Sequence, residues 1–496
     1  MFIEWYFNKS SALFQSMTAL LETEKLTDAE TVAFAQYLIE IAKATNEYSS
    51  PVIEKALCRV AERIGNGLEL SQRFESKKVL HVATLLRSYG GHTQLIARWM
   101  RFDSHYCNDM AILEVSSEIP DELMKEAQSR GAKIWMCEKQ GAIDRALWLR
   151  KLASNYEYVV LHVHHPEVVH VLAFGTKLFK RPVLFMNHTD HLFWVGVSVS
   201  DAILNMSTRA KSFTAKKRGR DDCFVLPIPL DLTVAPDIEK DRARRQLGIP
   251  NDVKILMSCG SFYKYIPISL KKSFFWLILK TLFARKDVVA VIVGVRPSSL
   301  IWATLKKLLR DRLLLKGVCD HHELHTMLIA ADIYVDSYPI SGFTALCEAR
   351  MNATPIVAID TGFAYYDSLL DSCVPFDGVE ERINLLLSSS TNVDGAALLR
   401  EHTKIPWVKQ LHDVMNRVPK KHEIWEISAP AADLQALDRT LYYHYAGQLM
   451  NLSLLWCRIP RMHKLKVMWI FVKNSRYTVV AVLLSMRAMF FKIISL

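Results

Sequence analysis

Three residues that can move protons or contact a sugar stand together in MNHTDHLFW, residues 186–194. His188, Asp190 and His191 follow an apolar run, so we expect them at the end of a buried strand. Such a cluster can orient a sugar hydroxyl, act as a base or bind a metal. Zinc usually requires a third ligand, so sugar contact or proton transfer is favoured, with loop hydrogen bonding as the alternative. The histidines of HVHHP at 162–166 also end a predicted strand, where a structural or cleft-lining role is favoured.

Two glycine turns carry residue types that bind anions. In SYGGHTQL, Gly90 and Gly91 separate a predicted strand from a predicted helix, and His92 follows them. Backbone N–H groups at a helix N-terminus can hold a phosphate, and glycine permits its close approach. An ordinary tight turn is the alternative. Because the sequence lacks G-x-G-x-x-G and the matching ribose acid, an NAD-dependent oxidoreductase is disfavoured.

The second turn lies in ILMSCGSFYKY, residues 255–265. Gly260 and Ser261 end a predicted strand, and Lys264 follows within one turn. A lysine ammonium is a point charge suited to a diphosphate, whereas a solvated loop lysine is the alternative interpretation.

The most specific segment spans residues 328–359. A strand is expected to run to Asp336, after which Gly342 and Thr344 begin a helix that carries Glu348. The helix N-terminus offers free N–H groups and a positive dipole to a phosphate. One turn further along, the Glu348 carboxylate can accept hydrogen bonds from ribose hydroxyls.

From residue 76 onward, short apolar runs alternate with longer amphipathic segments, which predicts buried strands separated by helices. The first series of strands is expected at 78–86, 110–115, 132–137, 158–165, 182–188, 202–207 and 223–230. The second is expected at 254–260, 288–294, 313–317, 332–338 and 354–360. This pattern predicts an α/β protein with two Rossmann-like parallel-sheet domains that bind ligands at the carboxyl ends of their strands, along an interdomain cleft.

Five regions follow from these patterns. They are a helical extension at 1–75, Rossmann-like domains at 76–230 and 231–403, a helix and connector at 404–457, and a basic amphipathic tail at 458–496. The extension shows two helix starts: a capping box at Thr27 and Glu30, and an N-cap at Ser50 followed by Pro51. No catalytic constellation occurs in the extension, so a packing or interaction role is expected there.

The positive charge is concentrated at the C-terminal end. The net charge is +11, and the tail carries eight basic residues with no acidic one. This distribution does not argue for nucleic-acid binding; it indicates that the C-terminal tail contacts an anionic partner. The tail suits an interfacial segment on anionic lipid, with a packed helix pair as the alternative. Its apolar run YTVVAVLLSM is too short to span a bilayer.

Composition narrows the class of protein. A hydrophobic fraction of 50% excludes disordered and collagen-like chains. The nine cysteines are scattered without a CxxC pair, which is typical of buried reduced thiols. The N-terminus makes a poor signal peptide. We therefore expect a cytoplasmic protein, with the tail offering a peripheral membrane position, and we expect neither a cofactor nor a metal.

The segment from Asp336 to residue 359 resembles the donor-binding segment of GT-B glycosyltransferases. The Gly90–Gly91 and Gly260–Lys264 turns resemble two other loops of these enzymes, and NHTDHLFWVG resembles a segment of bacterial members. The resemblance covers residues 76 to about 415 in the right order. It implies metal-independent, hexosyltransferase-type transfer from a nucleotide-diphosphate sugar to an acceptor hydroxyl. The acceptor domain would be 76–230 and the donor domain 231–403, with the late helix crossing back.

The resemblance also assigns roles. It places the donor diphosphate on Gly260, Ser261 and Lys264, and a phosphate on Gly342, Phe343 and Thr344. The ribose would contact Glu348. The donor sugar would lie near Asp190 and His191, beside Gly90, Gly91, His92 and His188. The implied acceptor is a sugar, a lipid-linked molecule or a protein, as in cell-surface polysaccharide or glycolipid synthesis. Many retaining members have Glu-x7-Glu, but Ile340 occupies the first of these positions, which leaves retention or inversion open.

Ile340 also keeps a catalytically silent binding or scaffolding protein open as an alternative. An epimerase of the same fold is another. A pyridoxal-dependent phosphorylase would need a Schiff-base lysine, which the sequence does not identify.

Overall fold

The structure is a computed structural model of the 496-residue chain. It describes residues 11, 14–42, 45, 47–87, 91–116, 119–190, 192–231, 238–266, 272–296, 300–360, 369, 372–388 and 399–427. Gly90, His191 and the tail 458–496 lie outside these residues. None of the helices in the described ranges is both long enough and apolar enough to cross a membrane.

Helices precede the first strand, as the sequence predicts. They are α2 (Leu20–Thr23), α3 (Asp28–Ala42) and α4 (Pro51–Arg63). The capping box is confirmed, because the Thr27 N–H donates to the Glu30 carboxylate at 2.9 Å and the Glu30 N–H donates to Thr27 Oγ1 at 3.3 Å. The Ser50 hydroxyl caps α4 by accepting from the Ile53 N–H. The apolar faces of these helices join the core of the first sheet.

The first domain is built on a seven-stranded parallel sheet in the order β3-β2-β1-β4-β5-β6-β7. Its strands are β1 (Glu75–Ala83), β2 (Cys107–Ile112), β3 (Ile134–Met136), β4 (Tyr156–His162), β5 (Val183–Asn187), β6 (Ala202–Asn205) and β7 (Cys223–Val225). The connecting helices are α5 (Gly91–Phe102), α6 (Asp121–Arg130), α7 (Ala142–Ala153), α8 (Val169–Phe174) and α9 (Thr208–Arg218). Helices α5 and α6 share one core cluster, whereas α7 and α8 share another with the N-terminal helices, so both faces are covered.

The second domain has a six-stranded parallel sheet in the order β10-β9-β8-β11-β12-β13, which is the doubly wound arrangement. Its strands are β8 (Lys254–Cys259), β9 (Val288–Val293), β10 (Leu313–Lys316), β11 (Ile333–Val335), β12 (Ile356–Asp360) and β13 (Cys373–Pro375). Its helices are α10 (Lys240–Leu247), α11 (Phe274–Ala284), α12 (Leu300–Leu309), α13 (His321–Ala330), α14 (Phe343–Met351) and α15 (Val379–Ser388). Helices α11, α12 and α15 cover one face, and α13 and α14 lie on the other.

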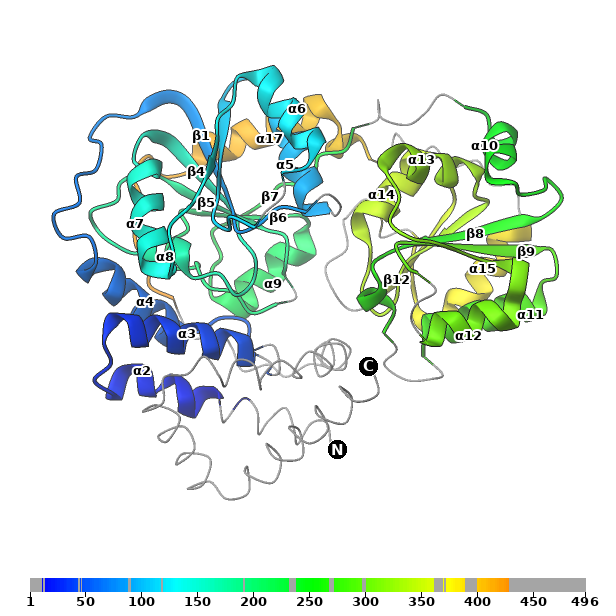
Figure 1. Ribbon diagram of the computed structural model, residues 1–496, viewed down its shortest axis with the longest axis horizontal. Helices are drawn as coiled ribbons and strands as arrows, with labels where there is room; N and C mark the ends of the chain where they lie inside the picture. The colour runs from blue at the N-terminus through cyan, green and yellow to red at the C-terminus, as the bar shows by residue number, and fades with distance from the viewer. Residues whose placement is uncertain are drawn as a thin grey trace.

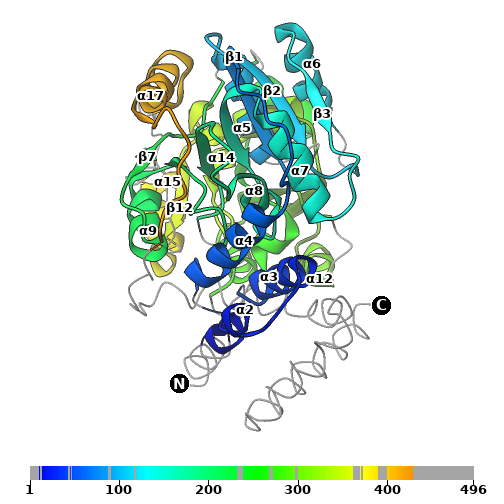
Figure 2. The same cartoon turned by 90° about the vertical axis from the view of Figure 1, so that its left-hand side faces the viewer.

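The two sheets confirm the predicted pair of Rossmann-like domains, which lie side by side in Figure 1. Among the strands in the described ranges, β13 alone was not predicted from the sequence. The domains share a contiguous apolar cluster that includes Trp99 of α5 and Leu346 of α14. Helix α17 (Lys404–Arg417) follows the second sheet in the chain but packs on the first domain, as Figures 1 and 2 show. There the indole of Trp407 lies 5.3 Å from that of Trp99 and donates to the Pro227 carbonyl at 2.6 Å.

Candidate functional site

Two helix N-termini from different domains meet at the interface. Helix α5 begins at Gly91, after β1, and α14 is capped by Gly342, after β11. A methyl group added at Gly91 would lie 2.6 Å from Thr344 Oγ1, so the absence of a side chain at Gly91 allows this close approach of the two helices. Each helix N-terminus carries positive partial charge. The arrangement therefore makes an anion favourable where they meet.

A lysine stands next to this meeting point. The loop after β8 turns at Gly260 and enters a short 3-10 helix, η2 (Phe262–Tyr265). Lys264 Nζ donates to the Ser341 carbonyl at 2.9 Å, one residue before the N-cap of α14. Burial lowers the pKa of Lys264, whereas the nearby Asp336 carboxylate raises it. The Gly260–Lys264 turn and the start of α14 thus form one site.

Asp336 organises the loop that leads into α14. Its side chain is fully buried, and Oδ1 accepts from the Gly342 N–H at 2.8 Å. Its Oδ2 accepts no hydrogen bond from the residues that the structure describes. Burial raises the pKa of Asp336 to about 6, and the Gly342 N–H partly offsets this. The Gly342 N–H is therefore already used within the protein, so it is not free to donate to a phosphate as the sequence suggested.

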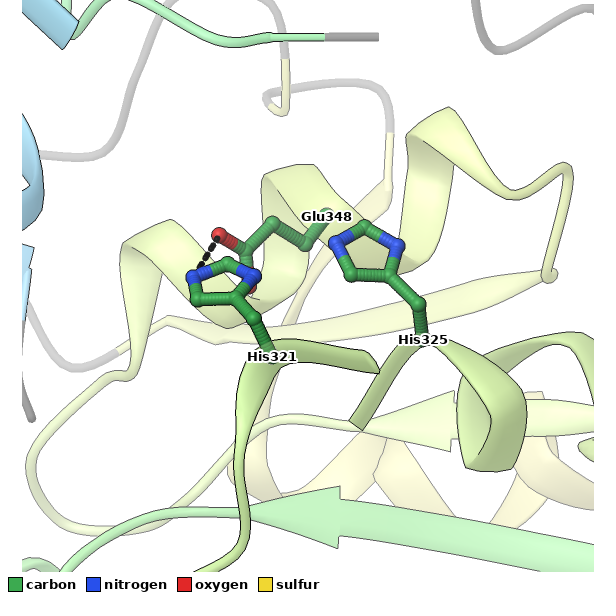
Figure 3. Close-up of side chains that lie close together, drawn as sticks. All are labelled: His321, His325 and Glu348. Atoms are coloured by element: carbon green, nitrogen blue, oxygen red, sulfur yellow. Dashed lines mark ion pairs between the residues drawn. The ribbon is translucent and has the colours of Figure 1, made fainter. Parts of the chain in front are cut away.

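Glu348, expected to contact a ribose, lies at the domain interface. Its Oε1 accepts from Arg98 Nη2 of α5 at 2.7 Å, and the two side chains are only 4% and 3% exposed. His321 of α13 places Nε2 at 3.8 Å from the same oxygen (Figure 3). The hydrogen bond from Arg98 and the approach of His321, which are the polar contacts found for this carboxylate among the described residues, both involve Oε1. The carboxylate therefore joins the two domains, which the sequence did not indicate.

His321, His325 and Glu348 form the one group with metal-ligand spacing in the described part of the chain. Asn352 Nδ2 donates to His325 Nδ1 at 3.0 Å and also to the Glu348 carbonyl at 2.7 Å. The second bond fixes the amide orientation, so His325 Nδ1 accepts and the proton sits on Nε2. A protonated nitrogen cannot ligate a metal, and Arg98 already balances the carboxylate. The group is better described as a carboxylate held by the Arg98 guanidinium, with two imidazoles beside it.

On the first domain, three histidines gather at the carboxyl ends of β4 and β5 and the start of α5. The His92 ring centroid lies 4.5 Å from that of His188 and 5.0 Å from that of His164. His92 Nε2 donates to the His162 carbonyl at 2.8 Å. Burial lowers the pKa of His92 well below its usual value, and the neighbouring imidazoles lower it further. His92 is therefore neutral, and because its Nε2–H donates to the His162 carbonyl, its Nδ1 can accept a hydrogen bond.

The loop that carries His188 and Asp190 is held from behind by Arg218, the last residue of α9. This guanidinium is fully buried and donates to the carbonyls of Asp190 and Leu192 at 2.8 and 2.7 Å. It also stacks 4.5 Å from the Trp194 ring centroid. Arg218 thus positions the backbone of the predicted proton-transfer loop. Burial lowers its pKa to about 10, so it remains charged.

Sequence patterns did not single out several residues of this interface. Arg98 and His321 lie in ordinary amphipathic helices, and only the packing of the two domains buries Arg98 against Glu348. Arg87 is exposed, and its positive charge acts on a residue of each domain. Burial is the main cause that lowers the pKa of His164 in the first domain, and the Arg87 charge lowers it further. Burial is the main cause that raises the pKa of Tyr263 in the second domain, and the Arg87 charge partly offsets it. The histidines after β4 had a local signal in HVHHP.

A scan against protein-family models and a sequence search of curated proteins found no match. Solved structures share the fold. Anabaena HepE in complex with UDP and glucose is 12% identical, with a TM-score of 0.52 over 69% of this chain and 100% of that chain. A glycosyltransferase from Rickettsia africae is 11% identical, with a TM-score of 0.55 over 69% of this chain and 99% of that chain. The chain therefore has the GT-B fold.

Proposed function

We propose that this chain is a glycosyltransferase that moves a hexosyl group from a nucleotide-diphosphate sugar to an acceptor hydroxyl between its domains. The observation that carries the proposal is the meeting of the α5 and α14 N-termini at Gly91 and Thr344, beside Lys264. Two positive helix ends and an ammonium group favour a diphosphate over a neutral ligand. Structures of Anabaena HepE contain UDP with glucose, or UDP-glucose, which supports this ligand class.

The donor would bind the second domain, residues 231–403, and the acceptor the first, residues 76–230. The acceptor oxygen forms a bond to the anomeric carbon while the bond from that carbon to the diphosphate oxygen breaks. The diphosphate leaves with the electron pair, and the acceptor proton passes to a base. We assign the base and sugar contacts to the loop of Asp190 and His191, with His188 and His92 beside it.

Stabilisation of the leaving group would come from Lys264 and the α14 N-terminus, with Ser261, Phe343 and Thr344 nearby. Groups already aimed at developing charge provide the largest contribution to many enzymatic rate accelerations. The proposal is therefore metal-independent. Turnover should survive a chelator in excess and should not rise when Mg²⁺ or Mn²⁺ is added; strict dependence on either ion would contradict it.

Glu348 would bind the ribose through Oε2 while Arg98 continues to hold Oε1. The carboxylate has two oxygens with about four acceptor sites, so both partners can be accommodated. The charge-assisted bond from Arg98 fixes the orientation of the Glu348 carboxylate. Ribonucleotides should therefore bind more tightly than their 2′,3′-dideoxy analogues.

Two measurements test the function. A thermal-shift panel of nucleoside diphosphates should raise the melting temperature with at least one member, because a ligand that binds only the folded state stabilises it. Transfer or slow hydrolysis of the matching sugar nucleotide should then be detected. A shift without turnover would favour a silent GT-B binding protein, interconversion of the free sugar nucleotide would favour an epimerase, and no shift with any nucleotide would contradict the proposal.

The acceptor is proposed to be a sugar, a lipid-linked molecule or a protein of cell-surface polysaccharide or glycolipid synthesis. A cytoplasmic location with peripheral membrane contact through 458–496 fits a lipid-linked acceptor. Deleting the tail should release the protein from membrane fractions; unchanged sedimentation with membranes would argue against this role.

A further inference from the structure

Helices α11 and α12 form the outer layer on one face of the second sheet, seen at the lower right of Figure 1. They contact each other, and their inner sides supply Ile278, Leu282, Trp302 and Leu305 to the core. Helices α13 and α14, which reach the domain interface, lie on the opposite face of the sheet. The outer sides of α11 and α12 therefore face away from the proposed active site.

These outer sides expose large apolar side chains. Trp276 and Phe283 of α11 are 47% and 56% exposed, and Ile301 and Leu308 of α12 are 41% and 55% exposed. Each pair is separated by seven residues, or about two helical turns, so each pair lies on one side of its helix. Single exposed apolar residues are ordinary, but these four lie on two contacting helices, which makes this face a candidate interaction site.

The charged residues between them are all basic. Neither helix contains an acidic residue, and Lys280 and Lys307 lie on the same exposed sides. Lys286, just after α11, places its ammonium 5.7 Å from the Phe283 ring centroid. Lys280 is paired with Glu380 of α15, whereas no ion pair is found for Lys286 or Lys307 among the described residues. Exposed aromatic and aliphatic groups interleaved with lysines are typical of surfaces that rest in a lipid headgroup layer.

We propose that the outer face of α11 and α12, defined by Trp276, Phe283, Ile301 and Leu308 with Lys286 and Lys307, docks on an anionic lipid surface. The apolar side chains would enter the headgroup boundary, and the lysines would contact lipid phosphates. A second copy of the chain fits less well, because a two-fold interface would bring these lysines near their own copies. The proposal does not depend on the proposed sugar transfer, and it concerns residues other than the tail.

Sedimentation with vesicles of phosphatidylcholine, with and without phosphatidylserine, tests it on the full chain. Wild type should bind the anionic vesicles more tightly, and added salt should weaken binding. Trp276→Ser with Phe283→Ser, and separately Lys286→Glu with Lys307→Glu, should each lower the partition coefficient about tenfold. The matched control replaces Val115 and Ile405, which are 55% and 83% exposed elsewhere, with serine, and it should bind as wild type does.

Because every variant keeps the tail, differences between them report on this face alone. Far-ultraviolet circular dichroism and the melting temperature check that the variants fold. Wild-type partitioning of both variant pairs would overturn the proposal. So would equal losses in the control, or a concentration-dependent dimer that only the Trp276→Ser and Phe283→Ser variant disrupts. That last result would assign the face to a protein partner.

Discussion

Arg98 Nη2 of the first domain lies 2.7 Å from Glu348 Oε1 of the second, and both side chains are almost completely buried. A buried charge is tolerated when it is paired, so each of these two charges offsets the desolvation cost of the other. Arg98 lies two turns into α5, whose first residue Gly91 meets Thr344 at the start of α14. The same two helices therefore bring together both the proposed phosphate site and the ion pair.

Breaking this pair should destabilise the chain. Arg98→Met leaves the Glu348 carboxylate buried without its main cation, and the expected loss in the free energy of unfolding is about 3–5 kcal/mol. Urea unfolding followed by tryptophan fluorescence measures it. The matched control is Arg98→Met combined with Glu348→Gln, which removes both charges and should recover much of the loss. Equal losses in the single and double variants would contradict a charge-pair role.

Adding a methyl group at Gly91 should push the two helices apart. The new Cβ would lie 2.6 Å from Thr344 Oγ1, and relieving that overlap is expected to cost about 1–3 kcal/mol of stability. Alanine is otherwise the better helix former, so any loss reports on the contact rather than on helix propensity. Thermal unfolding of Gly91→Ala, with Gly91→Ala/Thr344→Ala as the rescue, tests this. No recovery in the double variant would contradict the contact.

Much of the fold followed from the sequence because buried parallel strands leave continuous apolar runs. Strand β13 escaped because it has only three residues, one of which is proline, so no apolar run marks it. Within the site, Lys264 and Glu348 could be singled out because each follows a glycine turn within a few residues. Arg98 could not, because its partner is 250 residues away and an arginine on an amphipathic helix is usually solvated.

Because of Asp336, the free energy of unfolding should decrease as the pH rises through the mildly acidic range. Its folded pKa is raised to about 6 by burial, so between the usual carboxyl value and 6 the folded state binds more protons than the unfolded state. Its contribution therefore falls as the pH rises through that window, by up to about 3 kcal/mol. Asp336→Asn keeps an acceptor for the Gly342 N–H and should show a flatter profile and greater stability at neutral pH. Identical profiles for the two proteins, from urea unfolding at each pH, would contradict the assignment.

Replacing Lys264 tests the proposed chemistry most directly. Lys264 Nζ lies against the Ser341 carbonyl beside the α14 N-terminus, where the leaving diphosphate would gather negative charge. Lys264→Ala should lower kcat by about 10²–10³-fold, because a charged donor in a partly buried site contributes more to the transition state than to the ground state. Lys264→Arg retains the charge with a different shape and should retain more activity. Lys280→Ala, on the opposite face of the second sheet, is the matched control and should leave kcat unchanged. If Lys264→Ala instead raised KM and left kcat intact, the lysine would bind the donor without stabilising its departure.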